Sequence, residues 1–266
     1  MNLDFEFDGL RLSDFGCMIC DFNSGGDETV SAGSTITFTT TPLYYGAKFS
    51  LTGTKYEECL TATFDICKNP CQTDSHDFEY FTLAEEQEIM RWLNRKEFCE
   101  FRLLDSQYQG IHFNGSFNVN VVRWGQNIYG FELTLTTDRP FGVYDQSTYS
   151  FSFNQPNGTL TFTDLSDEIG YIYADMEITC LSAGNLTIRD SQEDRDILIK
   201  NCSQGEIISF HQPIIESSLN SHKIANDFNF NFPRISNTYL NRQNTFSFSL
   251  PCKGTIRYEP IAKVGL

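Results

Sequence analysis

Apolar and polar residues alternate with a period of two over most of this chain, and this pattern constrains its fold more than any other feature. Successive side chains of a strand point to opposite faces, so each alternating run predicts a half-buried β-strand. The chain contains 24 Phe and 12 Tyr, residues that fit a pleated surface well. The clearest runs are residues 117–121, 129–135, 228–232 and 246–250. The sequence therefore predicts a mainly β protein.

One segment departs from this alternation and predicts a helix. Thr82 and Glu85 have the spacing of a capping box, in which each side chain bonds the main-chain amide of the other residue. Apolar residues at helical spacing follow, namely Ile89, Met90, Trp92 and Leu93. The expected helix covers about residues 83–95 and is the one long helix of the chain.

Turn signals and a break suggest how the strands are organised. Asn114-Gly115 and Pro156-Asn157-Gly158 each lie between strand-like runs and predict two hairpins. A long run ends at residues 137–142, where Pro and Gly follow, so we expect a domain boundary there. The pattern of the second half of the chain predicts short strands only, as in a sandwich or barrel. Its last strand would place Ile256 and Tyr258 on one face.

The charge of the chain excludes some partners. With 19 basic and 35 acidic residues, the formal net charge is −16, which disfavours binding to nucleic-acid phosphates or to an anionic membrane. The first residues do not resemble a secretion signal, and no apolar stretch is long enough to span a membrane. We therefore expect a soluble protein made in the cytoplasm, with its nine cysteines reduced and mostly buried.

Candidate catalytic and metal-binding residues are few. Cys17 and Cys20 form a C-x-x-C pair, but the nearest second pair, Cys67 and Cys71, has the wrong spacing, so buried thiols are favoured over zinc. The histidines are scattered and are expected on the surface or in loops; they are His76, His112, His211 and His222.

Acidic clusters and aromatic residues leave two further alternatives open. Residues 190–196 lack the calcium-loop pattern, so a solvated loop is favoured there, as it is for Asp164, Asp167 and Glu168. Aromatic side chains could stack on sugars, although alternating aromatics are more often core. Four glycosylation sequons, at Asn114, Asn157, Asn185 and Asn201, carry little weight.

We assign no catalytic, cofactor-binding or metal-binding residue, leave the binding residues unassigned, and expect no enzyme activity.

Several segments resemble, in order and spacing, those of the distal tail proteins of siphophages. The opening Phe7-Asp8-Gly9 is similar to that family's first strand and turn, and the helix that contains Trp92-Leu93 is similar to its helix. Residues 235–241 lack the glycine that the family often has. The other segments that carry the resemblance are residues 13–16, 98–105, 131–140, 226–235 and 255–260.

The resemblance implies a fold and a role. Residues 1–139 would form a β-barrel-like, ring-forming domain with one helix, and residues 140–250 a galectin-like β-sandwich. Residues 251–266 would form a terminal strand that returns to the first domain. Six copies would close into a homohexameric ring at the virion tail tip, assembled in the host cytoplasm. The ring would join the major tail tube protein to the tail-associated hub protein, and receptor-binding and tape measure proteins are further candidate partners.

Two other functions compete with this structural role. The sandwich could be a carbohydrate-binding module that attaches to host cell-wall glycan, which predicts exposed aromatics in a groove. A cell-wall hydrolase would require two convergent carboxylates, and no motif supports it.

Overall fold

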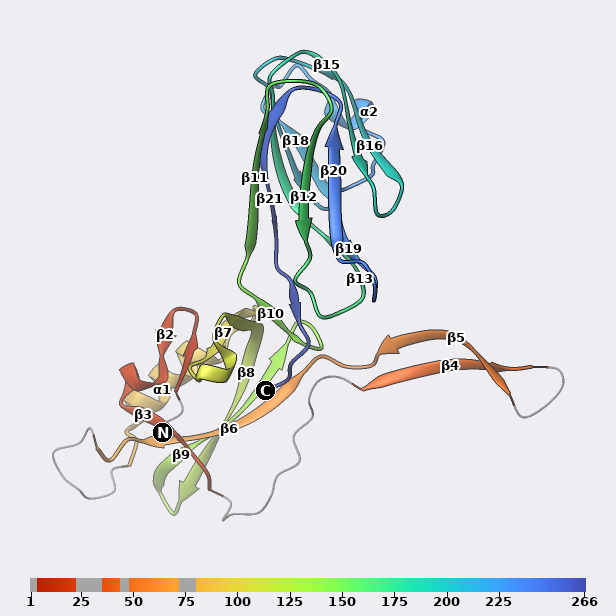
Figure 1. Cartoon of the computed structure of the whole chain (residues 1–266). Helices are drawn as coiled ribbons and strands as arrows, with labels where there is room; N and C mark the ends of the chain where they lie inside the picture. The colour runs from red at the N-terminus through yellow and green to blue at the C-terminus, as the bar shows by residue number, and fades with distance from the viewer. Residues whose placement is uncertain (1–3, 23–34, 44–47, 72–79) are drawn as a thin grey trace. The chain divides into compact units, whose positions relative to one another are not determined.

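The computed structural model describes residues 4–22, 35–43, 48–71 and 80–266 of the chain (Figure 1). Its contacts divide the chain into two compact units. The first unit comprises Met1–Val143 and Lys263–Leu266, and the second comprises Tyr144–Ala262. Both are built mainly from strands, so the predicted mainly β fold is confirmed.

The main sheet of the first unit has the strand order β2-β1-β7-β8-β9-β6-β3, and its neighbouring strands are antiparallel. β10 (Gly142–Tyr144) also pairs with β8. A separate two-stranded sheet contains β4 (Ile36–Pro42) and β5 (Phe49–Tyr56). The strands of the main sheet are β1 (Phe5–Phe7), β2 (Leu10–Arg11), β3 (Cys17–Cys20), β6 (Thr61–Lys68), β7 (Cys99–Leu103), β8 (Ile111–Trp124) and β9 (Asn127–Thr137). Two short 3-10 helices, η1 (Leu12–Phe15) and η2 (Ser106–Tyr108), lie in its connections.

This sheet is not the barrel-like structure that was expected. β2 and β3 form the two ends of the strand order, and among the described strands each pairs on one side only. β2 is two residues long and β3 is four, so neither offers a long edge for closing the sheet. Among the described strands, the main sheet is therefore open rather than closed into a barrel.

The predicted helix is confirmed as α1 (Leu83–Leu93). The Thr82 hydroxyl accepts a hydrogen bond from the Glu85 amide at 3.3 Å, and Glu85 accepts one from the Thr82 amide at 2.7 Å, as a capping box requires. Trp92 fixes the helix to the sheet because its Nε1 donates to the Phe7 carbonyl at 2.9 Å and its ring stacks on Phe15 at 4.2 Å. Ile89 and Leu93 are buried beside it. The apolar stripe of the helix thus covers one face of the sheet.

The hairpin predicted at Asn114-Gly115 is wrong, because β8 runs without interruption from Ile111 to Trp124. A Cβ atom at Gly115 would lie 2.8 Å from the carbonyl oxygen of Thr136 and 2.7 Å from a methyl carbon of Leu135. Glycine is therefore needed here for close approach of β9, not for a turn. The chain instead turns after Trp124, which pairs with Asn127 across Gly125, whose φ is +62°.

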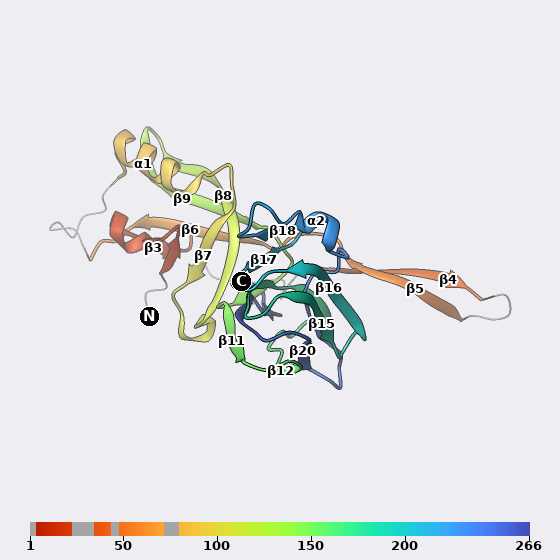
Figure 2. The ribbon, with the colours of Figure 1, turned by 90° about the horizontal axis from the view of Figure 1, so that it is seen from above.

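The second unit contains two larger sheets with one core between them (Figures 1 and 2). The five-stranded sheet has the order β11-β21-β14-β17-β18, the four-stranded sheet has the order β12-β20-β15-β16, and β13 pairs with β19. Phe, Ile and Cys side chains of both sheets fill the shared core, as in a β-sandwich. The strands are β11 (Ser147–Phe153), β12 (Gly158–Thr163), β13 (Gly170–Tyr173), β14 (Asp175–Cys180), β15 (Gly184–Asp190), β16 (Arg195–Cys202), β17 (Ile207–His211), β18 (Ile214–Ser217), β19 (Arg234–Asn237), β20 (Gln243–Phe248), β21 (Cys252–Tyr258) and β22 (Ile261–Ala262).

The turn predicted at residues 156–158 is present, but it does not close a hairpin. Asn157 has a φ of +62°, which suits a tight turn. However, β11 pairs with β21 and β12 pairs with β20, so the two strands lie in different sheets. The rings of Tyr149 and Phe162 stack with centroids 4.1 Å apart, because the two strands meet face to face across the core.

Residues 228–232 alternate like a strand, but the expected strand there is also wrong. A short helix, α2 (Ile224–Asp227), precedes them, and Phe230 is 67% exposed with a φ of +59°. Asparagine side chains hold this segment beside β16: Asn229 Oδ1 accepts from the Leu198 amide at 3.1 Å, and Asn231 Nδ2 donates to the Asp196 carbonyl at 2.8 Å. Side-chain hydrogen bonds thus replace most of the main-chain pairing.

The terminal strand also lies elsewhere than expected. β21 pairs with β11 and β14 inside the second unit, where Ile256 and Tyr258 are buried on one face as predicted. After this strand, residues Lys263–Leu266 belong to the first unit again. There the Gly265 carbonyl accepts from the Tyr108 hydroxyl at 3.1 Å, and the Val264 carbonyl accepts from the Gly142 amide at 3.2 Å.

Leucine-to-alanine substitutions at the two ends of α1 test which face of the helix stabilises the first unit. Leu93 is fully buried, so Leu93→Ala should lower the free energy of unfolding by about 2–5 kcal/mol. Leu83 is 66% exposed, so the matched control Leu83→Ala should change it by less than about 0.5 kcal/mol. Urea unfolding followed by tryptophan fluorescence reports this unit alone, because both tryptophans, Trp92 and Trp124, belong to it. Equal losses in the two variants would contradict this assignment.

Candidate functional site

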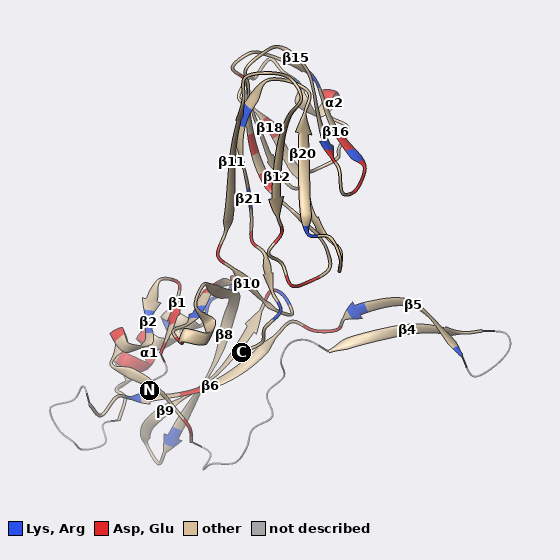
Figure 3. Cartoon of the chain, viewed as in Figure 1, with Lys and Arg blue, Asp and Glu red and all other residues tan. Residues whose placement is uncertain are grey.

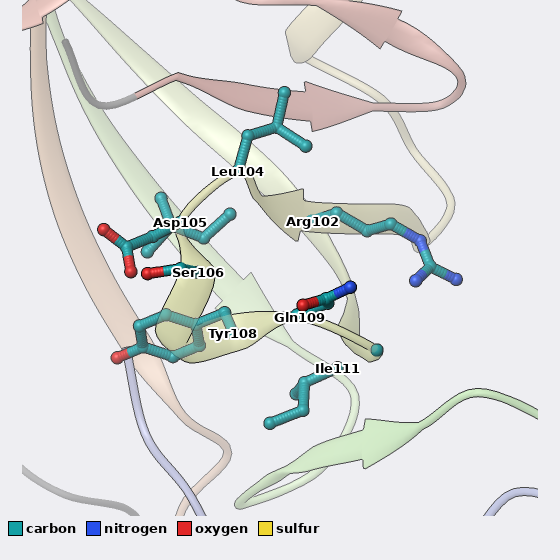
Figure 4. Close-up of a pocket in the computed structure, with 9 residues that line it drawn as sticks. Arg102, Leu104, Asp105, Ser106, Tyr108, Gln109 and Ile111 are labelled. Atoms are coloured by element: carbon teal, nitrogen blue, oxygen red, sulfur yellow. The ribbon is translucent and has the colours of Figure 1, made fainter. Parts of the chain in front are cut away.

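A surface hollow of about 390 Å³ lies between the end of β7 and the start of β8 (Figure 4). Arg102 there pairs with Glu100 at 2.6 Å, and Asp105 Oδ1 accepts from the Gln107 amide at 2.8 Å. Figure 4 shows the Arg102 guanidinium and the Asp105 carboxylate on opposite sides of the hollow. The hollow therefore does not bring together an acid, a base and a nucleophile, and its polar groups serve the local fold.

The cysteines of the C-x-x-C motif lie on β3, which pairs with β6. Cys20 and Cys67 are hydrogen bonded, and this bond together with burial raises the pKa of the Cys20 thiol. Burial is also the main reason that the pKa of Cys17 is raised to about 12. Cys71 is exposed. In the described part of the chain, no three His, Cys, Asp or Glu side chains are close enough together to hold a metal ion.

Two acidic residues that were expected in solvated loops are buried instead. Asp190 Oδ1 accepts from the amides of Gln192 and Glu193 and so caps the turn between β15 and β16. Asp164 accepts from the Ser166 hydroxyl at 2.9 Å and from Asn237 Nδ2 at 2.6 Å. Both carboxylates therefore satisfy buried polar groups in turns, which the sequence alone did not indicate.

The histidines do not share one environment. His76 lies outside the described residues, and His211 is exposed and pairs with Asp175 at 2.7 Å. His112 is buried on β8, so the expectation of a surface or loop position is wrong for it. His222 lies in a loop, as expected, but its side chain is only 6% exposed. His222 contacts Glu206, which lies 16 residues earlier in the chain. The sequence does not indicate this contact, because a single histidine in an irregular segment forms no motif.

The exposed aromatics of the sandwich do not form an open sugar-stacking platform around Arg234. Its guanidinium carbon lies 3.9 Å from the centroid of the Tyr171 ring, and it donates to the Tyr173 hydroxyl at 2.8 Å. Glu193 accepts from the same guanidinium at 3.3 Å and from the Ser236 hydroxyl at 2.6 Å. The Arg234 guanidinium thus covers one face of the Tyr171 ring, so a sugar cannot stack on that face.

The arm, which we define as β4, β5 and Lys48, exposes several large apolar side chains. Phe38 is 62% exposed, Phe49 is 61% exposed and Leu51 is 57% exposed. No residue of either strand is buried. Figure 1 shows β5 leading directly into β6 of the main sheet. Because isolated hairpins are only marginally stable in water, such a surface indicates contact with another molecule.

A buried charge cluster holds the connection between β18 and α2. The Glu206 carboxylate is fully buried and accepts from the Ser203 amide at 2.7 Å, from the Ser217 hydroxyl and from His222 Nδ1. His222 Nε2 lies 3.3 Å from Asp227 Oδ2. Burial alone would lower the pKa of His222, but the bond to Glu206 and its charge outweigh burial and raise it. Burial would raise the pKa of Glu206, but its hydrogen bonds lower it.

These opposite shifts predict how the stability of the second unit depends on pH. The contribution of His222 is complete below its ordinary pKa of 6.5 and is lost as the pH rises through the raised value. The contribution of Glu206 is complete above its ordinary pKa of 4.5 and is lost as the pH falls through the lowered value. The cluster should therefore stabilise the unit most between pH 4.5 and 6.5.

His222→Gln should remove the decline in stability above pH 6.5, whereas His211→Gln, at an exposed position, should leave it unchanged. The measurement is urea unfolding followed by far-UV circular dichroism at several pH values. The relevant transition is the one without a change in tryptophan fluorescence, since both tryptophans lie in the first unit. An unchanged pH profile in His222→Gln would contradict the cluster's role.

No helix in the described ranges is both long and apolar enough to cross a membrane. In Figure 3, acidic positions are red on α1, which contains Glu85, Glu86 and Glu88.

Comparisons with solved structures identify the fold. The chain is similar to the Dit protein of phage SPP1, a structure described as a paradigm of the hub adsorption apparatus in phages that infect Gram-positive bacteria. The TM-score is 0.66 at 9% sequence identity, over 97% of this chain and 99% of that chain. A Cry1Da tryptic core variant from Bacillus thuringiensis matches with a TM-score of only 0.25 at 9% identity, over 87% of this chain and 51% of that one. The first likeness confirms the expected two-domain, β-rich fold of the distal tail proteins.

Comparisons with sequences identify the family. No curated protein matches the chain. A family model described as a phage tail protein N-terminal domain matches residues 1–139, and one described as a phage tail C-terminal domain matches residues 141–258. The chain therefore belongs to the phage tail proteins, as a structural component that carries both the N-terminal and the C-terminal domain of that family.

Proposed function

We propose that this protein is the distal tail protein of a phage or prophage with a long, non-contractile tail. Six copies form a closed ring that joins the major tail tube protein to the tail-associated hub protein. The observation that carries this proposal is the likeness to the SPP1 Dit protein, which extends over nearly the whole of both chains and so includes both units. Fold alone does not give function, so further support must come from the surface of the molecule.

Two features of the first unit support assembly into a ring. Among the described strands, the main sheet is open, and β2 and β3 at its ends leave short edges at which another chain could pair. Its arm exposes apolar side chains that its own unit does not bury. A ring requires two different, complementary surfaces on each copy, because its contacts run head to tail. The first unit offers more than one surface of the required kind.

The proposed role requires no reaction at the protein. The buried carboxylates of Asp164 and Glu206 accept hydrogen bonds from side chains or amides of the same unit, as structural acceptors do. We therefore infer a scaffold rather than a cell-wall hydrolase. Its place is the virion tail tip, where receptor-binding and tape measure proteins are further candidate partners.

Electron microscopy of the purified full chain tests this proposal. Negative-stain averages should show closed sixfold rings, and native mass spectrometry should give the mass of six copies, with rings increasing as the protein is concentrated. A sample incubated with the major tail tube protein controls for a ring that needs its partner to assemble. Single particles in both samples would overturn the ring, and single particles that bind cell-wall glycan on an array would favour the carbohydrate-binding alternative.

A further inference from the structure

Three buried thiols lie at one end of the sandwich core of the second unit. Cys180 is the last residue of β14, Cys252 is the first residue of β21, and Cys202 is the last residue of β16. All three carry free thiols and are buried in the shared core. β14 and β21 belong to the five-stranded sheet and β16 to the four-stranded sheet, so both sheets contribute a thiol.

Main-chain hydrogen bonds place Cys180 beside the turn that follows Cys202. The Gly205 amide donates to the Cys180 carbonyl at 2.8 Å, and the Cys180 amide donates to the Glu206 carbonyl at 2.9 Å. The Cys180 thiol in turn donates a hydrogen bond to the sulfur of Cys202. The two sulfur atoms are therefore neighbours across the two sheets, in the position from which a disulfide forms.

Cys252 is the competing partner of Cys180. The two residues are directly opposite on β14 and β21, and the Leu181 amide donates to the Pro251 carbonyl at 2.9 Å, so they form a non-hydrogen-bonded pair. Burial raises the pKa of the Cys252 thiol to about 12, which keeps it protonated and a poor nucleophile. The hydrogen bond from Cys180 instead lowers the pKa of Cys202, against the effect of burial. Cys202 is thus the more reactive of the two possible partners.

The pair lies directly under a short surface turn. Gln204 and Gly205, which follow Cys202 in the chain, are exposed. One hydrogen bond that holds this turn is donated by the Ser203 amide to the Glu206 carboxylate at 2.7 Å. Short exposed segments open at a lower free energy than the whole domain does. Opening of this turn therefore gives a small molecule access to Cys202 without unfolding of the sandwich.

We propose that Cys180 and Cys202 are a modification site, at which a peroxide oxidises the two thiols to a disulfide that joins the two sheets. The Cys202 thiolate attacks one oxygen of the peroxide, the O–O bond breaks, and the departing hydroxide takes up a proton to become water. The Cys180 sulfur then attacks the resulting sulfenic acid of Cys202, the S–O bond breaks, and hydroxide leaves with the Cys180 proton as a second water. Two thiols thus lose two electrons, and one hydrogen peroxide is reduced to two waters.

The disulfide would act as a reversible staple of the second unit. Thiols stay reduced in the cytoplasm, whereas disulfides persist in oxidising surroundings. The pair is therefore a dithiol while the chain is made and becomes a disulfide where the protein meets peroxide. Joining residues that are distant in sequence restricts the unfolded chain, so the linked sandwich is the more stable form. This inference concerns the second unit by itself and does not depend on the proposed ring.

Disulfide mapping in the full chain tests the site. Cys59→Ser combined with Cys71→Ser first removes two exposed thiols, which could otherwise exchange with the link. The reduced, folded protein is treated with hydrogen peroxide, the remaining thiols are alkylated, and the chain is digested without reductant for mass spectrometry. We expect peptides joined through Cys180 and Cys202, with the mass of the two peptides less two hydrogen atoms, which dithiothreitol separates.

Other mapping results would overturn the inference. A link between Cys180 and Cys252 would show that the wrong partner has been chosen. Peroxide consumed at other cysteines, with Cys180 and Cys202 both recovered as alkylated thiols, would reject the site. A link that forms only in urea would show that it arises from the unfolded chain rather than from the folded sandwich.

A stability measurement on the same protein tests whether the link fits the folded sandwich. Oxidation should raise the thermal midpoint of the second unit by at least about 5 °C, and dithiothreitol should reverse the shift. The relevant transition is the one without a change in tryptophan fluorescence, since both tryptophans lie in the first unit. Cys202→Ala should abolish the shift, whereas the matched core variant Cys252→Ala should keep it. An unchanged or lower midpoint in the linked protein, or a shift that persists in Cys202→Ala, would contradict a disulfide that joins the sheets.

Discussion

Trp92 connects the helix of the first unit to its sheet, and much of that unit depends on this contact. The indole ring stacks on Phe15 and Phe5, and its N–H satisfies the carbonyl of Phe7 on a strand 85 residues away in sequence. A sheet with an apolar face must cover it, and here a single helix does so by a combination of ring stacking and one buried hydrogen bond. The same side chain therefore fixes the first strand, the 3-10 helix that follows and α1.

The second unit meets the same constraint with a second sheet. Tyr149 stacks on Phe162, and Phe151 stacks on Phe248, so each pair joins one sheet to the other. The arm is the exception. Its large apolar side chains, Phe38, Phe49 and Leu51, stay exposed among the described residues.

Acidic and histidine side chains, which would be the first candidates for catalysis, serve the turns instead. Asp164, Asp190 and Glu206 are buried acceptors of local hydrogen bonds. A buried carboxylate is costly unless it is bonded in this way, so such groups mark points where an irregular connection must be fixed. This agrees with a scaffold whose function lies in its surfaces.

The sequence by itself determined the elements whose signals are local. The alternation at residues 129–135 predicted β9, and the Thr82–Glu85 capping box predicted where α1 begins, because strand faces and helix caps depend on residues close in sequence. The resemblance to distal tail proteins also identified the fold correctly. Pairing partners, in contrast, were decided by the tertiary structure. Asn114-Gly115 reads as a turn, but the close approach of β9 makes it part of a strand. The alternating residues 228–232 are held by asparagine side chains on β16 rather than by strand pairing. The bond between Glu206 and His222, and the hydrogen bond between Cys180 and Cys202, depend on register and on contacts between distant residues, which periodicity does not specify.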